Sequence, residues 1–163
     1  MSAVTMPEPG RLARTTLDEV LAPLHERWLA AVQMAVRPAL SATSTRWDRW
    51  TAARYLRDEL ADRLGQERKL VRTIPELDRA GVRRIEAGFE VLERVLAEAT
   101  LAGRRRHTGG LMMVLLKSLL EHLADWYVAV EHATADVPLT RLPPEAVAIL
   151  SEFQPDEVPS AAW

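Results

Sequence analysis

Apolar residues recur at intervals of three and four along most of this chain, and that periodicity restricts it to helical folds. The spacing is typical of amphipathic α-helices, and no stretch shows the sustained alternation expected of strands. It extends over four segments, at residues 15–36, 47–74, 78–102 and 111–132. Because most connections between these segments are short, we expect the helices to pack as antiparallel neighbours around one core.

The expected fold is therefore all-α, an antiparallel up-down four-helix bundle over residues 15–139. A flexible N-terminal segment, residues 1–14, would precede the bundle, and a short C-terminal helix and tail, residues 140–163, would come after it. A length of 163 residues is enough for one domain with a substantial core.

Specific residues predict where the helices begin. Thr16 with Glu19 forms a capping-box pattern at the first helix, and Thr45 or Ser44 is suited to cap the second. Pro23 lacks an amide hydrogen, so the first helix either kinks there or begins there.

Other residues predict where the helices end. Pro75 stops the second helix and Gly103 the third, while Pro144 can open a short helix over residues 144–153.

Charge and composition exclude several classes of function. The net charge is −2, which gives no general attraction to nucleic acid or to acidic membranes, and there is no cysteine for disulfides or thiolate chemistry. The chain lacks a signal-peptide pattern at its start, and its longest apolar run, residues 111–116, is too short for a bilayer span. We expect a cytoplasmic protein with neither a nucleic-acid nor a membrane partner.

Three polar residues lie on the apolar stripes and are expected to point inward. His25 shares its face with Leu21 and Leu29, Glu67 lies among leucines of the second helix, and His122 lies beside Leu119. A lone histidine on an apolar face is usually a hydrogen-bonded core residue. Two histidines and a carboxylate together are also the ligand types of non-haem iron sites, which helical bundles assemble from facing helices.

The order of these segments resembles the hemerythrin-like family of non-haem di-iron bundles. LDEVLAPLHERWLAAV is similar to the first ligand-bearing helix, LRDELADRLGQERKLVRTIPEL to the second, RRIEAGFEVLERVL to the third and LLKSLLEHLADWYVAVEHA to the fourth. The resemblance covers roughly residues 16–139. It implies that His25, Glu67 and His122 are metal ligands, that the cofactor is iron, and that the function is oxygen binding, sensing or oxidative chemistry.

The chain departs from the family pattern at the other ligand positions. The second helix has Arg63 where the family has a histidine one turn before Glu67, the third has Gly88 or Phe89 at its histidine, and the fourth has Trp126 at its carboxylate. A guanidinium does not bind metal. If buried, Arg63 and Glu67 would form a structural salt bridge, and if not they would splay to the surface. Phe89 and Trp126 would fill the vacated volume.

Two hypotheses remain open. In the first, His25, Glu67 and His122 still hold one metal ion, iron, with oxygen or another small ligand at the open positions. In the second, the bundle is metal-free, a polar network around Arg63 and Glu67 fills its core, and the protein acts as a structural subunit or binds a protein partner.

Several remaining residues are expected at the surface or the bundle ends. We interpret Glu121, Asp125 and Glu131 as mainly surface positions, and the basic cluster at residues 104–107 as solvated loop charge. Trp47 and Trp50 are expected to cap one end of the core, or alternatively to anchor a partner. The sequence contains no phosphate-binding loop and no GxSxG or HExxH motif that would indicate an enzyme.

Overall fold

The computed structural model describes residues 15–105 and 108–153, and this part of the chain is all-helical, as predicted. The first bundle helix is α2 (Leu17–Val36), which a 3₁₀ turn, η1 (Arg37–Leu40), connects to the next segment. That segment is built from α3 (Arg46–Tyr55), a π-helical stretch, η2 (Leu56–Leu60), and α4 (Ala61–Arg72). The chain continues with α5 (Arg79–Arg104), α6 (Gly109–Thr134), a second 3₁₀ turn, η3 (Leu139–Arg141), and α7 (Pro144–Glu152). The predicted flexible segment, residues 1–14, and the tail beyond residue 153 lie outside the described residues.

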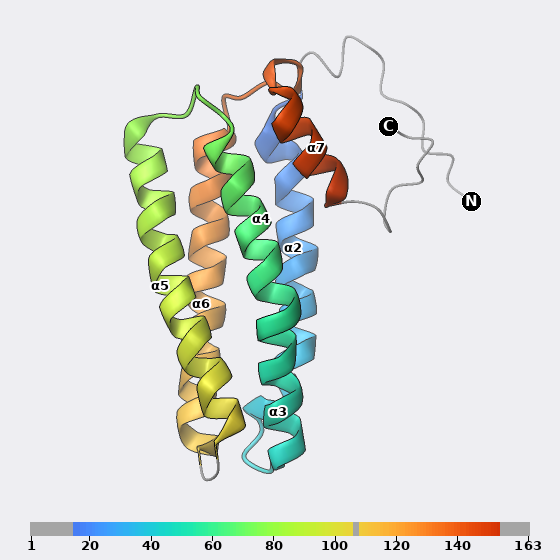
Figure 1. Cartoon of the computed structure of the whole chain (residues 1–163), viewed down its shortest axis with the longest axis vertical. Coiled ribbons are helices and arrows are strands. Elements are labelled where there is room, and N and C mark those ends of the chain that lie inside the picture. Colours follow the sequence, from blue (N-terminus) through green and yellow to red (C-terminus); the bar gives the residue numbers. More distant parts are fainter. Residues whose placement is uncertain (1–14, 106–107, 154–163) are drawn as a thin grey trace, which may run out of the picture.

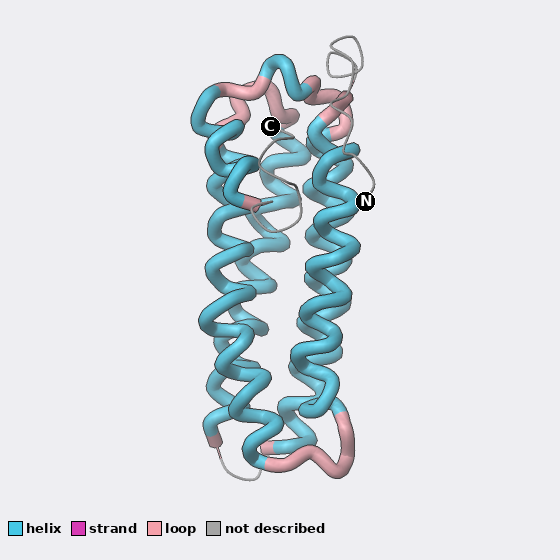
Figure 2. The backbone as a smooth tube through the Cα atoms, turned by 90° about the vertical axis from the view of Figure 1, so that its right-hand side faces the viewer, coloured by secondary structure: helices cyan, strands magenta, loops and turns pink. Residues whose placement is uncertain are grey.

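The long helices lie side by side along the longest axis of the molecule (Figures 1 and 2). α5 packs against α6, α2 against α6, and α3 against α5. The short α7 lies beside α4 at one end (Figure 1) and buries Ala146 and Leu150. None of the helices among the described residues has the length and apolar character needed to cross a membrane.

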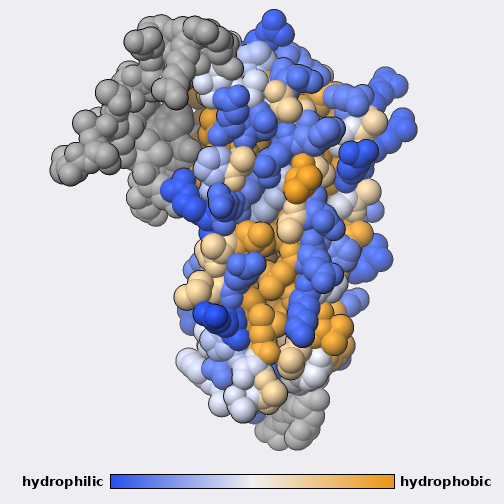
Figure 3. All heavy atoms as spheres, turned by 180° about the vertical axis from the view of Figure 1, so that it is seen from behind, coloured by the Kyte–Doolittle hydropathy of each residue, from blue (hydrophilic) through white to orange (hydrophobic). Residues whose placement is uncertain are grey.

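The predicted apolar stripes form the core. On the second helical segment, the residues of this stripe are all buried: Leu56, Leu60, Leu64, Glu67, Leu70, Val71 and Ile74. On α5 the stripe is also correct, with Val82 and Val95 half-buried at its edge. Figure 3 shows that apolar side chains also gather on the surface, on the half of the back face where α6 begins. Leu111 and Val114 of α6 are among the exposed apolar residues.

The predicted capping box at Thr16 and the predicted cap at Thr45 or Ser44 have different outcomes. Thr45 accepts a hydrogen bond from the Asp48 amide at 3.1 Å, and the Asp48 carboxylate accepts one from the Thr45 amide at 2.8 Å. The box at Thr16 and Glu19 is wrong, because the Thr16 hydroxyl donates to the Asp18 carboxylate and caps no amide.

Two further boundary predictions are corrected. α2 begins at Leu17 and continues through Pro23, so Pro23 does not start the helix. α5 continues past Gly103 to Arg104. A Cβ at Gly103 would lie 2.6 Å from Ala53 Cβ and 2.8 Å from the Arg49 carbonyl oxygen, so this glycine allows α5 to approach α3 closely instead of ending the helix.

A short stretch of backbone pairing holds the start of α2 against the connection after α6. The Leu17 amide donates to the Val137 carbonyl at 2.8 Å, and the Leu139 amide to the Thr15 carbonyl at 3.0 Å. These bonds close the bundle at the end where α7 packs.

Candidate functional site

A buried histidine links three helices in the core. His25 of α2 is 3% exposed, and Glu67 of α4 is fully buried. The Nε2 atom of His25 is hydrogen-bonded to Glu67 Oε1, and its Nδ1 atom to Glu131 Oε2 of α6 at 2.9 Å. One imidazole ring thus joins carboxylates from two other helices.

Helical spacing explains why these side chains meet. His25 lies one turn after Leu21 and one turn before Trp28, both buried in the core. Glu67 occupies the same kind of position one turn after Leu64 on α4. Residues three or four apart share one face of a helix, so the stripes that bury the leucines also bury these polar groups.

The expectation that Glu131 is mainly a surface residue is wrong. Its side chain is 31% exposed, and one carboxylate oxygen reaches inward to His25. It also lines an open groove of about 420 Å³ between α2 and α6, together with His25 and Tyr127. The carboxylate therefore connects the buried ring to the surface.

Burial and charge act in opposite directions on His25. Burial alone would lower its pKa, but the hydrogen bonds and negative charges of Glu67 and Glu131 outweigh that effect and raise it. The pKa of Glu67 is raised by burial, and the hydrogen bond and charge of His25 offset this only in part. His25 and Glu67 therefore each bind a proton more tightly than the same side chain would in water.

Tyr127 completes the packing around the imidazole, a role that the sequence pattern did not indicate. Its ring stacks on His25 with centroids 4.1 Å apart and an interplanar angle of 9°. Its hydroxyl is buried without a hydrogen-bond partner in the described part of the chain, and burial raises its pKa. The available signal was that Tyr127 lies one helical turn before Glu131, on the same side of α6.

Arg63 lies in the same cluster, but its role differs from the predicted one. Its Cζ atom lies 5.2 Å from the centroid of the Trp28 ring, and among the described residues it forms no ion pair with Glu67. The Nη1 atom of Arg63 and the Oε2 atom of Glu67 are both buried, and neither has a hydrogen-bond partner among residues 15–105 and 108–153. The arginine charge nevertheless opposes, in small part, the rise that burial causes in the pKa of Glu67.

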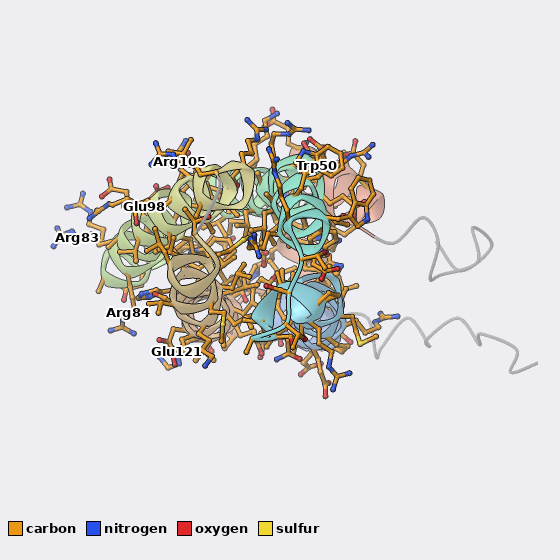
Figure 4. The ribbon with its side chains drawn as sticks, turned by 90° about the horizontal axis from the view of Figure 1, so that it is seen from below. Trp50, Arg83, Arg84, Glu98, Arg105 and Glu121 are labelled. Atoms are coloured by element: carbon orange, nitrogen blue, oxygen red, sulfur yellow. The ribbon has the colours of Figure 1, made fainter. Side chains whose placement is uncertain are left out.

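His122 does not join this cluster. It is half-buried and lines a separate open groove of about 360 Å³ between α5 and α6, with Arg84 and Asp125. Arg84 and Glu121 point outward from the bundle (Figure 4). The structure therefore brings together two of the predicted ligands, His25 and Glu67, and places the third elsewhere.

Phe89 and Trp126 are buried, as predicted. Their ring centroids are 6.0 Å apart, and the Trp126 Nε1 atom donates to the Ile85 carbonyl at 3.0 Å. A Cβ at Gly88 would lie 2.9 Å from Trp126 Cδ1, so the absent side chain at Gly88 gives the indole its space.

The donor set does not fit a di-iron centre. Within residues 15–105 and 108–153, no group of three or more histidine, cysteine, aspartate or glutamate side chains is arranged to hold a metal ion. The positions that would supply further ligands hold Arg63, Phe89 and Trp126, none of which coordinates iron.

Comparison with protein-family models, with curated proteins and with solved structures finds no match for this chain.

Proposed function

We propose that this chain is a metal-free structural or protein-interaction subunit whose core is held by the His25 network. In this proposal α2, the α3–α4 segment, α5 and α6 form an antiparallel up-down bundle, and α7 covers one end. The proposal keeps the polar core expected from the sequence, but its centre is His25 instead of an Arg63–Glu67 salt bridge.

The observation that carries this proposal is that both ring nitrogens of His25 are bonded to carboxylates. A histidine binds metal through the lone pair of one nitrogen, and an imidazolium donates from both nitrogens and has no lone pair to offer. The raised pKa of His25 favours that charged form. The ring therefore has the bonding expected of a buried cation between two anions.

Arg63 supports the same proposal. Burial raises the pKa of Glu67, and the positive charge of Arg63, one turn away on α4, partly opposes that rise, as a bound cation would. A permanent guanidinium close to a metal would repel it, since arginine stays charged in proteins.

A second candidate is a divergent hemerythrin-like site with one non-haem iron ion, and one specific observation favours it. Histidine ligands usually bond a carboxylate through their second ring nitrogen, as His25 does with Glu131. Glu67 Oε2 is also buried, and no described residue forms a hydrogen bond to it. His25 and Glu67 would then be the ligands, with His122 outside the site and a small ligand such as oxygen at the open positions.

Metal analysis separates the two candidates. Tag-free protein would be incubated with ferrous iron without oxygen, desalted, and analysed by plasma mass spectrometry, alongside His25→Ala and His122→Ala. The metal-free proposal predicts far less than one iron per chain in all three, with the wild type fully folded by circular dichroism. Near-stoichiometric iron that is lost in His25→Ala and kept in His122→Ala would instead establish the second candidate.

A further inference from the structure

Two tryptophans near the start of α3 are exposed, contrary to the expectation that they cap the core. Trp47 is 68% exposed and Trp50 is 39% exposed, whereas Trp28 and Trp126 are buried. The two indoles stack on each other with centroids 5.1 Å apart and an interplanar angle of 26°. The capping box at Thr45 fixes the start of α3 and thereby the face on which both rings lie.

One arginine packs against this pair, and further arginines lie close to Asp58 on the same segment. The Cζ atom of Arg54 lies 5.6 Å from the centroid of the Trp50 ring, extending the stack by one guanidinium. Arg54 and Arg57 are both exposed and share one carboxylate, that of Asp58, at 3.7 Å and 2.7 Å. The hydrogen bond from Arg57 lowers the pKa of Asp58, and the charge of Arg104 from α5 acts in the same direction.

The surface therefore carries more positive than negative charge around an exposed aromatic pair. One carboxylate faces three guanidinium groups from two helical segments, and Arg46 is also exposed beside Trp47. Figure 4 shows Trp50 pointing outward at this end of the bundle. Tryptophan and arginine are the residues most enriched at the energetic centres of protein interfaces.

We propose that Trp47, Trp50, Arg54 and Arg57 form a docking surface for an acidic segment of a protein partner that carries an aromatic or large aliphatic side chain. The apolar side chain would pack on the free face of the Trp47 indole, and the acidic residues would pair with the arginines. This proposal rests on the interaction role proposed above and names the surface that carries it.

The charge distribution favours a protein over a nucleic acid. The whole chain has a net charge of −2, and Asp48, Asp58 and Glu59 lie among the arginines of this segment. A phosphate backbone would meet these carboxylates, and mutual stacking of the indoles leaves fewer ring faces free for bases. An acidic peptide can place its fewer charges opposite the arginines alone.

Peptide selection tests the proposal directly. A random 16-residue display library would be selected on the full chain and, in parallel, on the double variant Trp47→Ser/Trp50→Ser. The matched control is Met34→Ser, which removes a side chain on α2 that is 66% exposed. Because all three residues are exposed, the variants should unfold at the wild-type temperature, and circular dichroism would confirm this.

We expect the enriched peptides to be net negative and to carry an aromatic or large aliphatic residue. Their affinity should fall at least about tenfold in the double variant and by less than about twofold in Met34→Ser. Raising the salt concentration should weaken binding, because the arginine contacts are exposed.

Four results would overturn the proposal. They are an absence of tryptophan-dependent enrichment, enrichment of neutral or basic peptides, tryptophan-dependent binding of a 15-residue oligothymidylate, and self-association in sedimentation that the double variant abolishes. The last two would assign the surface to nucleic acid or to a second copy of the chain. The metal analysis concerns the core and this selection the surface, so a failure of one proposal can be told apart from a failure of the other.

Discussion

At the scale of single residues, His25 determines how the core balances its buried charges. A fully buried carboxylate such as Glu67 is costly unless it is paired and hydrogen-bonded. His25 supplies both the bond and the charge, and Glu131 stabilises the other side of the ring. Arg63 adds a positive charge at longer range, and Tyr127 excludes water from one face of the imidazole.

Replacing His25 should therefore destabilise the folded protein strongly. His25→Ala leaves Glu67 buried without its partner, and we expect the free energy of unfolding to fall by about 3–5 kcal/mol. Urea denaturation followed by circular dichroism would measure it. His122→Ala is the matched control and should cost no more than about 1 kcal/mol, because His122 is half-buried beside a groove. Equal losses in both variants would contradict the central position of His25.

The raised pKa of His25 also predicts a pH dependence of stability. The folded protein binds this proton more tightly than the unfolded chain, so the contribution is fully present below the ordinary histidine value of 6.5 and is lost as the pH rises through the raised value. The pKa of Glu67 is also raised, so its contribution to the free energy of unfolding likewise decreases as the pH rises above 4.5. The charges that face His25 come from Glu67 and Glu131, and those that face Glu67 include Arg63.

We therefore expect the free energy of unfolding to decrease between pH 6.5 and alkaline pH. Urea titrations of the wild type and of His25→Gln at a series of pH values would show a larger decrease in the wild type, because only Glu67 contributes in the variant. His122→Gln should keep the wild-type slope. A wild-type stability that is flat or rises over this interval would contradict the charged form of His25.

At the scale of helices, two glycines inside helices have opposite roles. A Cβ at Gly103 would lie within 3.0 Å of atoms of α3 and α6, one of them a backbone oxygen that cannot move aside cheaply. Around a Cβ at Gly65, in the interior of α4, the described residues place no atom within 4 Å, apart from the neighbouring backbone of the helix itself. The residue pattern predicts a helix stop at Gly103. Glycine is common both at helix ends and where two helices approach closely, and the sequence does not distinguish these two roles.

The two glycines therefore predict alanine effects of opposite sign. Gly103→Ala should lower the free energy of unfolding by about 1–3 kcal/mol through overpacking between α5 and α3. Gly65→Ala should raise it by about 0.5–1 kcal/mol, because alanine has less backbone freedom to lose in a helix. Urea denaturation of both variants would test this pair, and a stabilising Gly103→Ala would show that the helices are not in close contact.

At the scale of the whole molecule, α7 belongs to the same core as the bundle helices. Leu150 is 4% exposed and packs in the core cluster, and the ring of Phe153, just after α7, contacts Trp28 edge-on at 5.2 Å. The helical pattern predicts a bundle that ends at residue 139, with residues 140–163 as a separate segment. The described residues show contacts between α7 and α4 across that boundary.

Leu150→Ala should therefore destabilise the entire bundle. The loss of buried volume predicts a decrease of about 2–5 kcal/mol in a single cooperative transition. Val147→Ala, at a position of α7 that is 47% exposed, should have little effect. Thermal unfolding would check both, and an early separate transition in Leu150→Ala would mean that α7 unfolds independently.

Helical periodicity made the elements and most of the core predictable, because burial of one face imposes a repeating pattern on the sequence. It identified His25 and Glu67 as inward-facing for the same reason. It could not identify Glu131 or Tyr127 as part of the site, since their contacts depend on how α6 is rotated against α2. The inward placement of His122 was inferred from the same kind of stripe, but the helix rotation turned this residue toward the groove beside α5.

The exposure of Trp47 and Trp50 could not be predicted from the sequence either. An aromatic residue at the end of a helix is equally compatible with a core cap and with a surface, because the choice depends on whether another segment covers it. In the described residues α3 is packed through Ala52 and Ala53 instead, which leaves the indoles outside.

The measurement that tests the central claim most directly is the nuclear magnetic resonance spectrum of the His25 ring nitrogens in ¹⁵N-labelled protein at neutral pH, with His25→Gln to assign the signals. We predict that both nitrogens are protonated, as in an imidazolium bonded to Glu67 and Glu131, and that ferrous iron added without oxygen leaves the signals unchanged. An unprotonated Nε2, or signals that broaden and shift stoichiometrically with iron, would contradict this and favour the metal site.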